Sequence, residues 1–341
     1  MKSLISSFLA AAIAAPVAAQ DALLRVLPTR SELVCWLQLD ALRDLIGPEL
    51  LREARRHIHL DFGTEAAGTE AAGDDSLERF SRRWGFDPIA DVGSVAVIGS
   101  PPGPSVLAAR TNARIDVLLE RLRASGACEP AASGGVELLR LPAAKLARAL
   151  GALPPPDQPD TAMLLHRLAI DDHTRVLLLG QDAAAVAALA GAMRDPREPA
   201  ALPPGMRPGC LLFVAVRGPI ANVLGDDPHS RVLQKANDVS LQFAEHDGEL
   251  RLTASIDTGD VRDARQIAAV VNGLKALATL LAPEDAEVPE VLVEAWHRAA
   301  ASADGKAVRL DVAVASDVLR RALHELARDR ARPPATRETG K

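Results

Sequence analysis

Two histidines and an aspartate stand at alternate positions in the segment HIHLD, residues 57–61. Alternate side chains of an extended segment point to the same side, so two imidazoles and one carboxylate could meet a single metal ion. A metal held in this way could activate water, which predicts a metal-dependent hydrolase with His57, His59 and Asp61 as ligands. The alternative interpretation is the end of a helix whose histidines face solvent.

The rest of the chain adds no clear partner cluster to this group. The spacing is similar to the first half of the metallo-β-lactamase motif, but Phe62 stands where that motif has a further histidine. His166 and residues 171–173 belong to one predicted hairpin, and residues 226–229 to a predicted helix start, where polar residues serve as turns and caps. Because GxSxG, HExxH, GxGxxG and phosphate-binding glycine loops are all missing, the sequence predicts no catalytic residue and no cofactor.

The amino-acid composition makes several classes of binding partner less expected. The net charge of −6 argues against nucleic acid and against an anionic membrane surface, since both favour basic proteins. Aromatic residues make up only 3% and tyrosine is missing, which disfavours sites that stack sugars or bases. Trp36, Trp84 and Trp296 are predicted to lie in the core.

The three cysteines allow at most one disulfide within the chain. Cys35 and Cys210 lie in apolar runs and are predicted to be buried. Cys128 lies in the segment SGACEP and is predicted to be the most exposed. The sequence does not decide whether any two of them pair.

The N-terminus has the pattern of a secretory signal peptide. Lys2 precedes a short apolar stretch, and small residues lead up to Ala19, which predicts a signal peptide over residues 1–19. The alternative is an uncleaved anchor. No later segment is long and apolar enough to predict a membrane span. We therefore expect an exported protein, periplasmic or extracellular.

One structural unit is clearest in residues 238–281. Residues 239–243 alternate between apolar and polar, and residues 246–249 predict a turn with Gly248 at positive φ. Residues 250–256 then alternate again, with Arg251, Thr253 and Ser255 on the polar side. Asp260 is a predicted helix cap, so the unit is strand, turn, strand, helix.

Repetition of this unit predicts an α+β fold of two pseudo-repeated halves. Each half is predicted to be an antiparallel sheet of β-hairpins with helices packed on one face. The predicted domains are residues 20–198, with a flexible loop at 62–75, and residues 210–330. A linker rich in proline and glycine, residues 199–209, separates them, and residues 331–341 form a disordered tail.

The organisation resembles a group of exported bacterial α+β proteins of planctomycete-like genomes whose function is unknown. The features that carry this resemblance are the signal peptide, Leu27-Pro28 before the opening strand, and GFDPIADV (residues 85–92) before the next strand. The resemblance implies export and an α+β fold, and it implies no activity.

A chain rich in predicted structure and poor in motifs favours binding over catalysis. We expect a non-enzymatic protein of the periplasm that binds a protein or small-molecule partner of the envelope between its two halves. The alternatives are the metal-dependent hydrolase and a structural cell-envelope protein.

Overall fold

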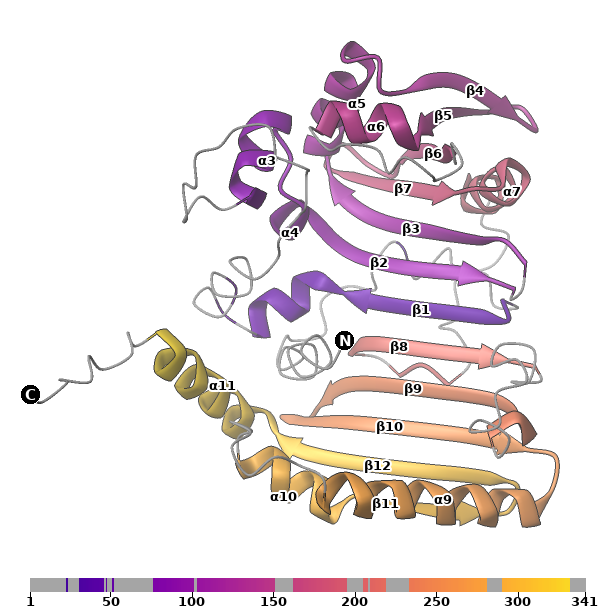
Figure 1. Ribbon diagram of the computed structural model, residues 1–341, viewed down its shortest axis with the longest axis vertical. Coiled ribbons are helices and arrows are strands. Elements are labelled where there is room, and N and C mark those ends of the chain that lie inside the picture. The colour runs from indigo at the N-terminus through magenta and orange to yellow at the C-terminus, as the bar shows by residue number, and fades with distance from the viewer. Residues whose placement is uncertain are drawn as a thin grey trace, which may run out of the picture.

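A single long antiparallel sheet organises the protein, and helices pack against it (Figure 1). The computed structural model describes residues 23, 31–45, 47, 51, 76–100, 103–150, 162–194, 205–207, 209–218, 233–280 and 290–331. In sheet order, its strands are β11 (Ala300–Asp304), β12 (Ala307–Ala315), β10 (Glu249–Thr258), β9 (Ala236–His246), β8 (Cys210–Arg217), β1 (Leu33–Gln38), β2 (Val92–Gly99), β3 (Ser105–Asn112), β7 (Thr174–Gly180), β6 (Ala162–Ala169), β5 (Val136–Pro142) and β4 (Glu129–Ser133). Every neighbouring pair is antiparallel.

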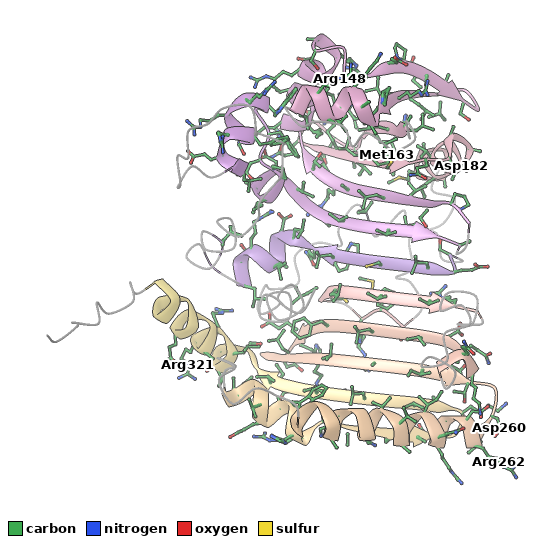
Figure 2. All side chains as sticks on the ribbon, in the orientation of Figure 1. Arg148, Met163, Asp182, Asp260, Arg262 and Arg321 are labelled. Atoms are coloured by element: carbon green, nitrogen blue, oxygen red, sulfur yellow. The ribbon has the colours of Figure 1, made fainter. Side chains whose placement is uncertain are left out.

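The helices follow the hairpins, as the α+β prediction expects. Their bounds are α3 (Ser76–Trp84), α4 (Pro88–Asp91), α5 (Arg114–Ala124), α6 (Ala143–Leu150), α7 (Ala183–Arg194), α9 (Val261–Leu280), α10 (Glu290–Arg298) and α11 (Ser316–Ala331), and residues 39–45 are also helical. Asp182 and Asp260 stand at the starts of α7 and α9 (Figure 2), where their Oδ1 atoms accept from the backbone N–H groups of Ala185 at 2.9 Å and Arg262 at 2.6 Å. These caps satisfy N–H groups that have no partner inside the helix.

The prediction of two separate sheets is wrong, because the two halves join edge to edge. β1 pairs with β2 on one side and with β8 on the other, so the sheet continues across the middle. Trp36 lies opposite Phe213 in this register, and both side chains are almost fully buried. Pairing removes two open edges at once. β1 and β8 are apolar on both faces because each strand contributes side chains to two different core clusters.

Helices cover both faces of the first half, which corrects the prediction of one covered face. On α7, Val186 and Leu189 belong to the same core cluster as Leu178 of β7. Ile115 of α5 belongs to a different cluster, which contains Leu177. Because successive residues of a strand point to opposite faces, α7 and α5 lie on opposite sides of the sheet.

The second half is covered on one face only by the helices that the structure describes. α9 contributes Ile267 to a cluster with Val308 of β12, and α11 contributes Leu319 to a cluster with Leu250 of β10. The other face of these strands carries polar side chains, including Thr253, which is half-buried. We call this surface the open face. It consists of the residues on this side of β10 and β12, together with Asp238 and Ser240 at one end of β9, whereas Gln242 and Ala244 of β9 are buried.

Several local predictions are confirmed and some are wrong. The β9–β10 turn has Gly248 at φ 75°, and Asp247 also takes a positive φ, of 52°. Trp36 and Trp84 are buried as predicted, whereas Trp296 is 40% exposed on α10. Strand β4 was missed by the sequence patterns, because EPAAS contains a proline and small residues rather than typical strand formers.

Some predictions fall on residues that the structure does not describe. These are the signal peptide (residues 1–19), the loop at 62–75, most of the linker at 199–209, and the tail beyond residue 331. In the described part of the chain, no helix combines the length and the apolar character that crossing a bilayer would require.

Candidate functional site

The predicted metal ligands His57, His59 and Asp61 lie outside the described residues, so their arrangement stays a prediction. Within the part of the chain that the structure describes, no group of three or more His, Cys, Asp or Glu side chains could hold a metal ion. The three cysteines are free thiols: Cys210 is buried, while Cys35 and Cys128 are half-buried. Burial raises the pKa of the Cys210 thiol to about 12, which makes it a poor nucleophile in the folded protein.

The polar residues of the β6–β7 hairpin serve its structure. His166 is buried, and its Nδ1 atom lies 2.6 Å from the carbonyl oxygen of Glu137. Asp171 Oδ1 accepts from the backbone N–H groups of His173 at 2.8 Å and Thr174 at 2.7 Å. These hydrogen bonds lower the pKa of Asp171, because they stabilise its carboxylate form. The prediction that this cluster is a turn is confirmed.

The segment GFDPIADV builds a structural joint in front of β2. Asp87 caps α4, with Oδ1 accepting from the N–H groups of Ile89 at 2.9 Å and Ala90 at 3.2 Å. Asp91 is almost fully buried, and its Oδ2 atom accepts in return from the Asp87 N–H at 2.7 Å. Arg43 donates to the carbonyl of Val92 at 2.8 Å and fastens the segment to the helix at 39–45. The side chains of Asp87, Asp91 and Arg43 therefore all bond to the backbone of this segment.

An ion network beside this joint is also structural. The carboxylate of Asp40 lies between the guanidinium groups of Arg43 and Arg110. Gly93 makes room for it, because a Cβ atom at that position would lie 2.3 Å from Arg110 Nη2. One carboxylate shared by two arginines is a closed arrangement that needs no ligand.

The best candidate site is a hollow of about 150 Å³ on the open face, at one end of β8, β9 and β10. Its polar side chains come from directly opposite positions: Asp238 faces Asp257, and Ser240 faces Ser255. Arg217 of β8 lies opposite Asp238 on the other side. The residues that line the hollow are Ala215, Val216, Arg217, Asp238, Val239, Ser240, Ser255 and Asp257. We call this the β8–β10 hollow.

The charge of the β8–β10 hollow is unbalanced. Two carboxylates stand against one guanidinium, and like charges in directly opposite strand positions repel each other. Asp238 Oδ1 accepts from the backbone N–H of Gly218 at 2.9 Å, which helps to hold that side chain in place. The hollow therefore combines two hydroxyls with an excess negative charge, a combination suited to a small polar ligand with an amino group.

Comparisons with known proteins assign no family to this chain. No protein-family model matches it, and no curated protein matches it. Among solved structures, crystal form III of TP0453 is similar with a TM-score of 0.40 and 8% identity over 89% of this chain and 97% of that chain. Crystal form IV of TP0453 gives a TM-score of 0.40 with 9% identity, over 89% and 96% of the two chains. At this level, the similarity carries no conclusion about function.

None of the hollow-lining residues was singled out from the sequence. Ser255 was recognised as part of a polar strand face, and such alternation predicts contact with water rather than a site. The signal that could have found the hollow is the repetition of polar pairs at matched distances from the Asp247–Gly248 turn. Asp238 and Asp257 meet across this turn, as do Ser240 and Ser255.

Proposed function

We propose that this protein is an exported, non-enzymatic binding protein that takes a small polar ligand with an amino group in the β8–β10 hollow. The observation that carries the proposal is the hollow itself. It lies on the sheet face that the described helices leave open, and four of its side chains face one another in two pairs. An acyl-transfer or hydrolytic function has no comparable support in the geometry of these residues.

The volume and the charge of the β8–β10 hollow define the class of ligand that we propose. A volume of about 150 Å³ suits a compact molecule such as a polyamine end, an amino sugar or an amino acid. The ammonium group would lie between Asp238 and Asp257, where the opposed carboxylates are stabilised by a cation. Hydroxyl groups of the ligand would bond to Ser240 and Ser255.

Export is part of the proposal. It is supported by the charge, the apolar stretch and the small residues within residues 1–19, which together fit a cleaved signal peptide. A protein of the periplasm meets small amines and envelope partners directly, so the proposed site would be accessible after export.

We also infer that the two halves are pseudo-repeats around the central β1–β8 pair. The support is the order of strands counted outward from the centre. It is β1-β2-β3-β7-β6 in one direction and β8-β9-β10-β12-β11 in the other. In both directions, the third strand is followed along the chain by a helix, α5 or α9. The β4–β5 hairpin is then an insertion in the first half.

Calorimetry with a panel of small amines, matched uncharged alcohols and small carboxylates tests the binding proposal. We expect binding within the amine class, weakened about tenfold or more by Asp257→Asn, because one charge-assisted bond is lost. Asp311→Asn is the matched control, since Asp311 lies on the same face outside the hollow. Equal effects of the two substitutions, or no binding from any amine, would contradict the proposal.

A further inference from the structure

Two apolar rows cross the middle of the sheet on the face opposite the open face. In directly opposite positions of β3, β2, β1, β8 and β9, the first row consists of Leu107, Val97, Cys35, Val214 and Leu241. The second row, on β1, β8 and β9, consists of Leu33, Val216 and Val239. Strand alternation turns the side chains of Val216 and Val239 away from the β8–β10 hollow, which lies on the other face. We call these two rows the apolar strip.

The apolar strip lacks the cover that the rest of this face has. Its side chains are half-buried, except that of Leu107, which is 37% exposed. Among the residues that the structure describes, none of the strip belongs to a core cluster or packs against one. Figure 1 shows α5 and α6 over one side of this face and α9 over the other, with β1, β2, β8 and β9 between them. A continuous apolar surface of this kind is typical of a binding site.

The dimensions of the strip favour a narrow ligand over a protein. Neighbouring strands are about 4.8 Å apart, and rows two residues apart along a strand are separated by about 7 Å, so the strip is about 20 Å long and about 10 Å wide. This area of about 200 Å² is a quarter of the roughly 800 Å² that each partner buries in a stable protein interface. The strip also has none of the Trp, Tyr and Arg side chains that carry most binding energy in such interfaces.

An extended hydrocarbon chain fits both the composition and the length of the strip. Apart from the thiol of Cys35, every side chain of the strip is aliphatic and has no hydrogen-bonding group. One acyl chain spans one leaflet of a bilayer core, which is about 15 Å thick, so a row about 20 Å long can cover such a chain. Burial of hydrocarbon is non-directional and needs only apolar contact.

A cation stands at the β9 end of the strip. Ile256, which lies opposite Val239, packs against the core cluster of α9, so α9 lies on the same face as the strip. Lys235 Nζ donates to Asp263 Oδ1 of α9 at 2.6 Å and to Gln266 Oε1 at 3.1 Å. An ammonium group has three N–H donors, so Lys235 can also donate to a carboxylate of a ligand. Its side chain is 43% exposed, which makes it accessible from solvent.

We propose that the apolar strip binds one fatty acid, with the carboxylate at Lys235 and the chain extending from Leu241 to Leu107. The strip is a second site on the other face of the sheet, and it does not depend on the β8–β10 hollow. The source is a dissolved fatty acid rather than a membrane, because the net charge of −6 opposes contact with an anionic bilayer surface.

Labelling of the two half-buried thiols tests the proposal on the unaltered protein. Cys35 lies in the strip and Cys128 lies outside it, and burial raises the pKa of both thiols. We expect laurate below its micellar concentration to slow maleimide labelling of Cys35 at least about tenfold, to leave Cys128 unchanged, and butyrate to have no effect. Mass spectrometry of the peptides distinguishes the two thiols.

Three results of this labelling would overturn the proposal. The first is a Cys35 rate that laurate leaves unchanged, or slows no more than that of Cys128. The second is protection that begins only where laurate forms micelles. The third is protection of Cys35 that grows with protein concentration in the absence of laurate, which would assign the strip to a second copy of the chain.

Substitutions at the two ends of the strip test the placement of the ligand by calorimetry. Leu107→Glu should weaken laurate binding at least about tenfold, because a carboxylate would lie against the hydrocarbon chain. Ile170→Glu is the matched control, since Ile170 is 42% exposed outside the strip, and it should leave binding unchanged. Lys235→Gln should weaken laurate about tenfold and dodecanol not at all, because only the acid loses a charge-assisted bond. Equal effects at Leu107 and Ile170, or equal losses for the acid and the alcohol, would contradict this placement.

Discussion

The same face of the sheet is a core in the first half and a surface in the second. One row of opposite residues runs from β7 to β12 on this face: Leu178, Ala108, Ala96, Trp36, Phe213, Gln242, Thr253 and Asp311. The row is apolar and buried as far as Phe213, and it is polar from Gln242 onward. Gln242 is still covered, since its Oε1 atom accepts from the backbone N–H of Arg207 at 3.1 Å. Asp311 at the end of the row is exposed.

The two halves of this face differ because different elements pack on them. α7 covers the first half of this face, and Leu23 and Met206 join the same cluster near the middle. In the second half, the described helices all pack on the opposite face, where apolar residues continue across the sheet. Whether a strand face belongs to the core or to the surface depends on whether other elements pack on it, and the residue types on that face are apolar or polar accordingly. The β8–β10 hollow lies where the cover ends.

The largest effect is expected from removing a large side chain at the covered end of the row. Trp36→Ala should lower the free energy of unfolding by about 3–5 kcal/mol, because Trp36 is 1% exposed and its removal leaves a cavity. Thr253→Ala, in the same row on the open face, should change the free energy of unfolding by less than about 0.5 kcal/mol. Urea denaturation measures both, and similar losses would contradict the distinction between the two halves.

A smaller loss is expected from a buried carboxylate of the covered half. Asp91 accepts from the Asp87 N–H at 2.7 Å and from Asn112 Nδ2 at 2.7 Å, so Asp91→Ala leaves two donors unpaired. We expect the free energy of unfolding to fall by about 2–3 kcal/mol. Asp311→Ala on the open face is the control and should be nearly neutral in the same denaturation assay. If Asp91→Ala were also neutral, the joint at residues 85–92 would not be structural.

The smallest effect concerns an ion pair that depends on pH. Burial raises the pKa of Asp116, but hydrogen bonds from Arg167 at 2.5 Å and Arg175 at 3.1 Å outweigh burial and leave it below 3.8. A depressed folded-state pKa adds stability above the unfolded pKa, and this stability is lost as the pH falls through the folded value. Because this ion pair is partly exposed and screened by solvent, Asp116→Asn should therefore cost at most about 1 kcal/mol at about pH 7 and less at about pH 2. Thermal unfolding at both pH values measures the difference, and a cost that persists at low pH would show that packing is responsible.

Local structure was predictable because short-range patterns determine it. The alternation at residues 250–256, the turn glycine Gly248 and the capping residues Asp182 and Asp260 all lead to the observed elements. The β1–β8 pairing was not predicted, since periodicity within a strand does not say which strand lies beside it. The near-continuous apolar runs of both strands were the available signal for a central position.

The candidate site was harder to predict than the fold. Asp238 and Asp257 are 19 positions apart, and only the register of the β9–β10 hairpin places them opposite each other. Each of them alone is an ordinary polar residue of a strand end. The motif that did suggest chemistry, His57 to Asp61, depends on side-chain directions that a sequence does not determine.

Cysteine labelling tests the contrast between the two halves of the face most directly. Thr253→Cys and Ala108→Cys are compared in a background where Cys35, Cys128 and Cys210 are replaced by alanine. Thr253 is half-buried and Ala108 is fully buried, in the same row of the sheet. The account predicts that a maleimide modifies the cysteine at 253 at least about a hundredfold faster than the one at 108, which must wait for unfolding. Equal rates at the two positions would contradict it.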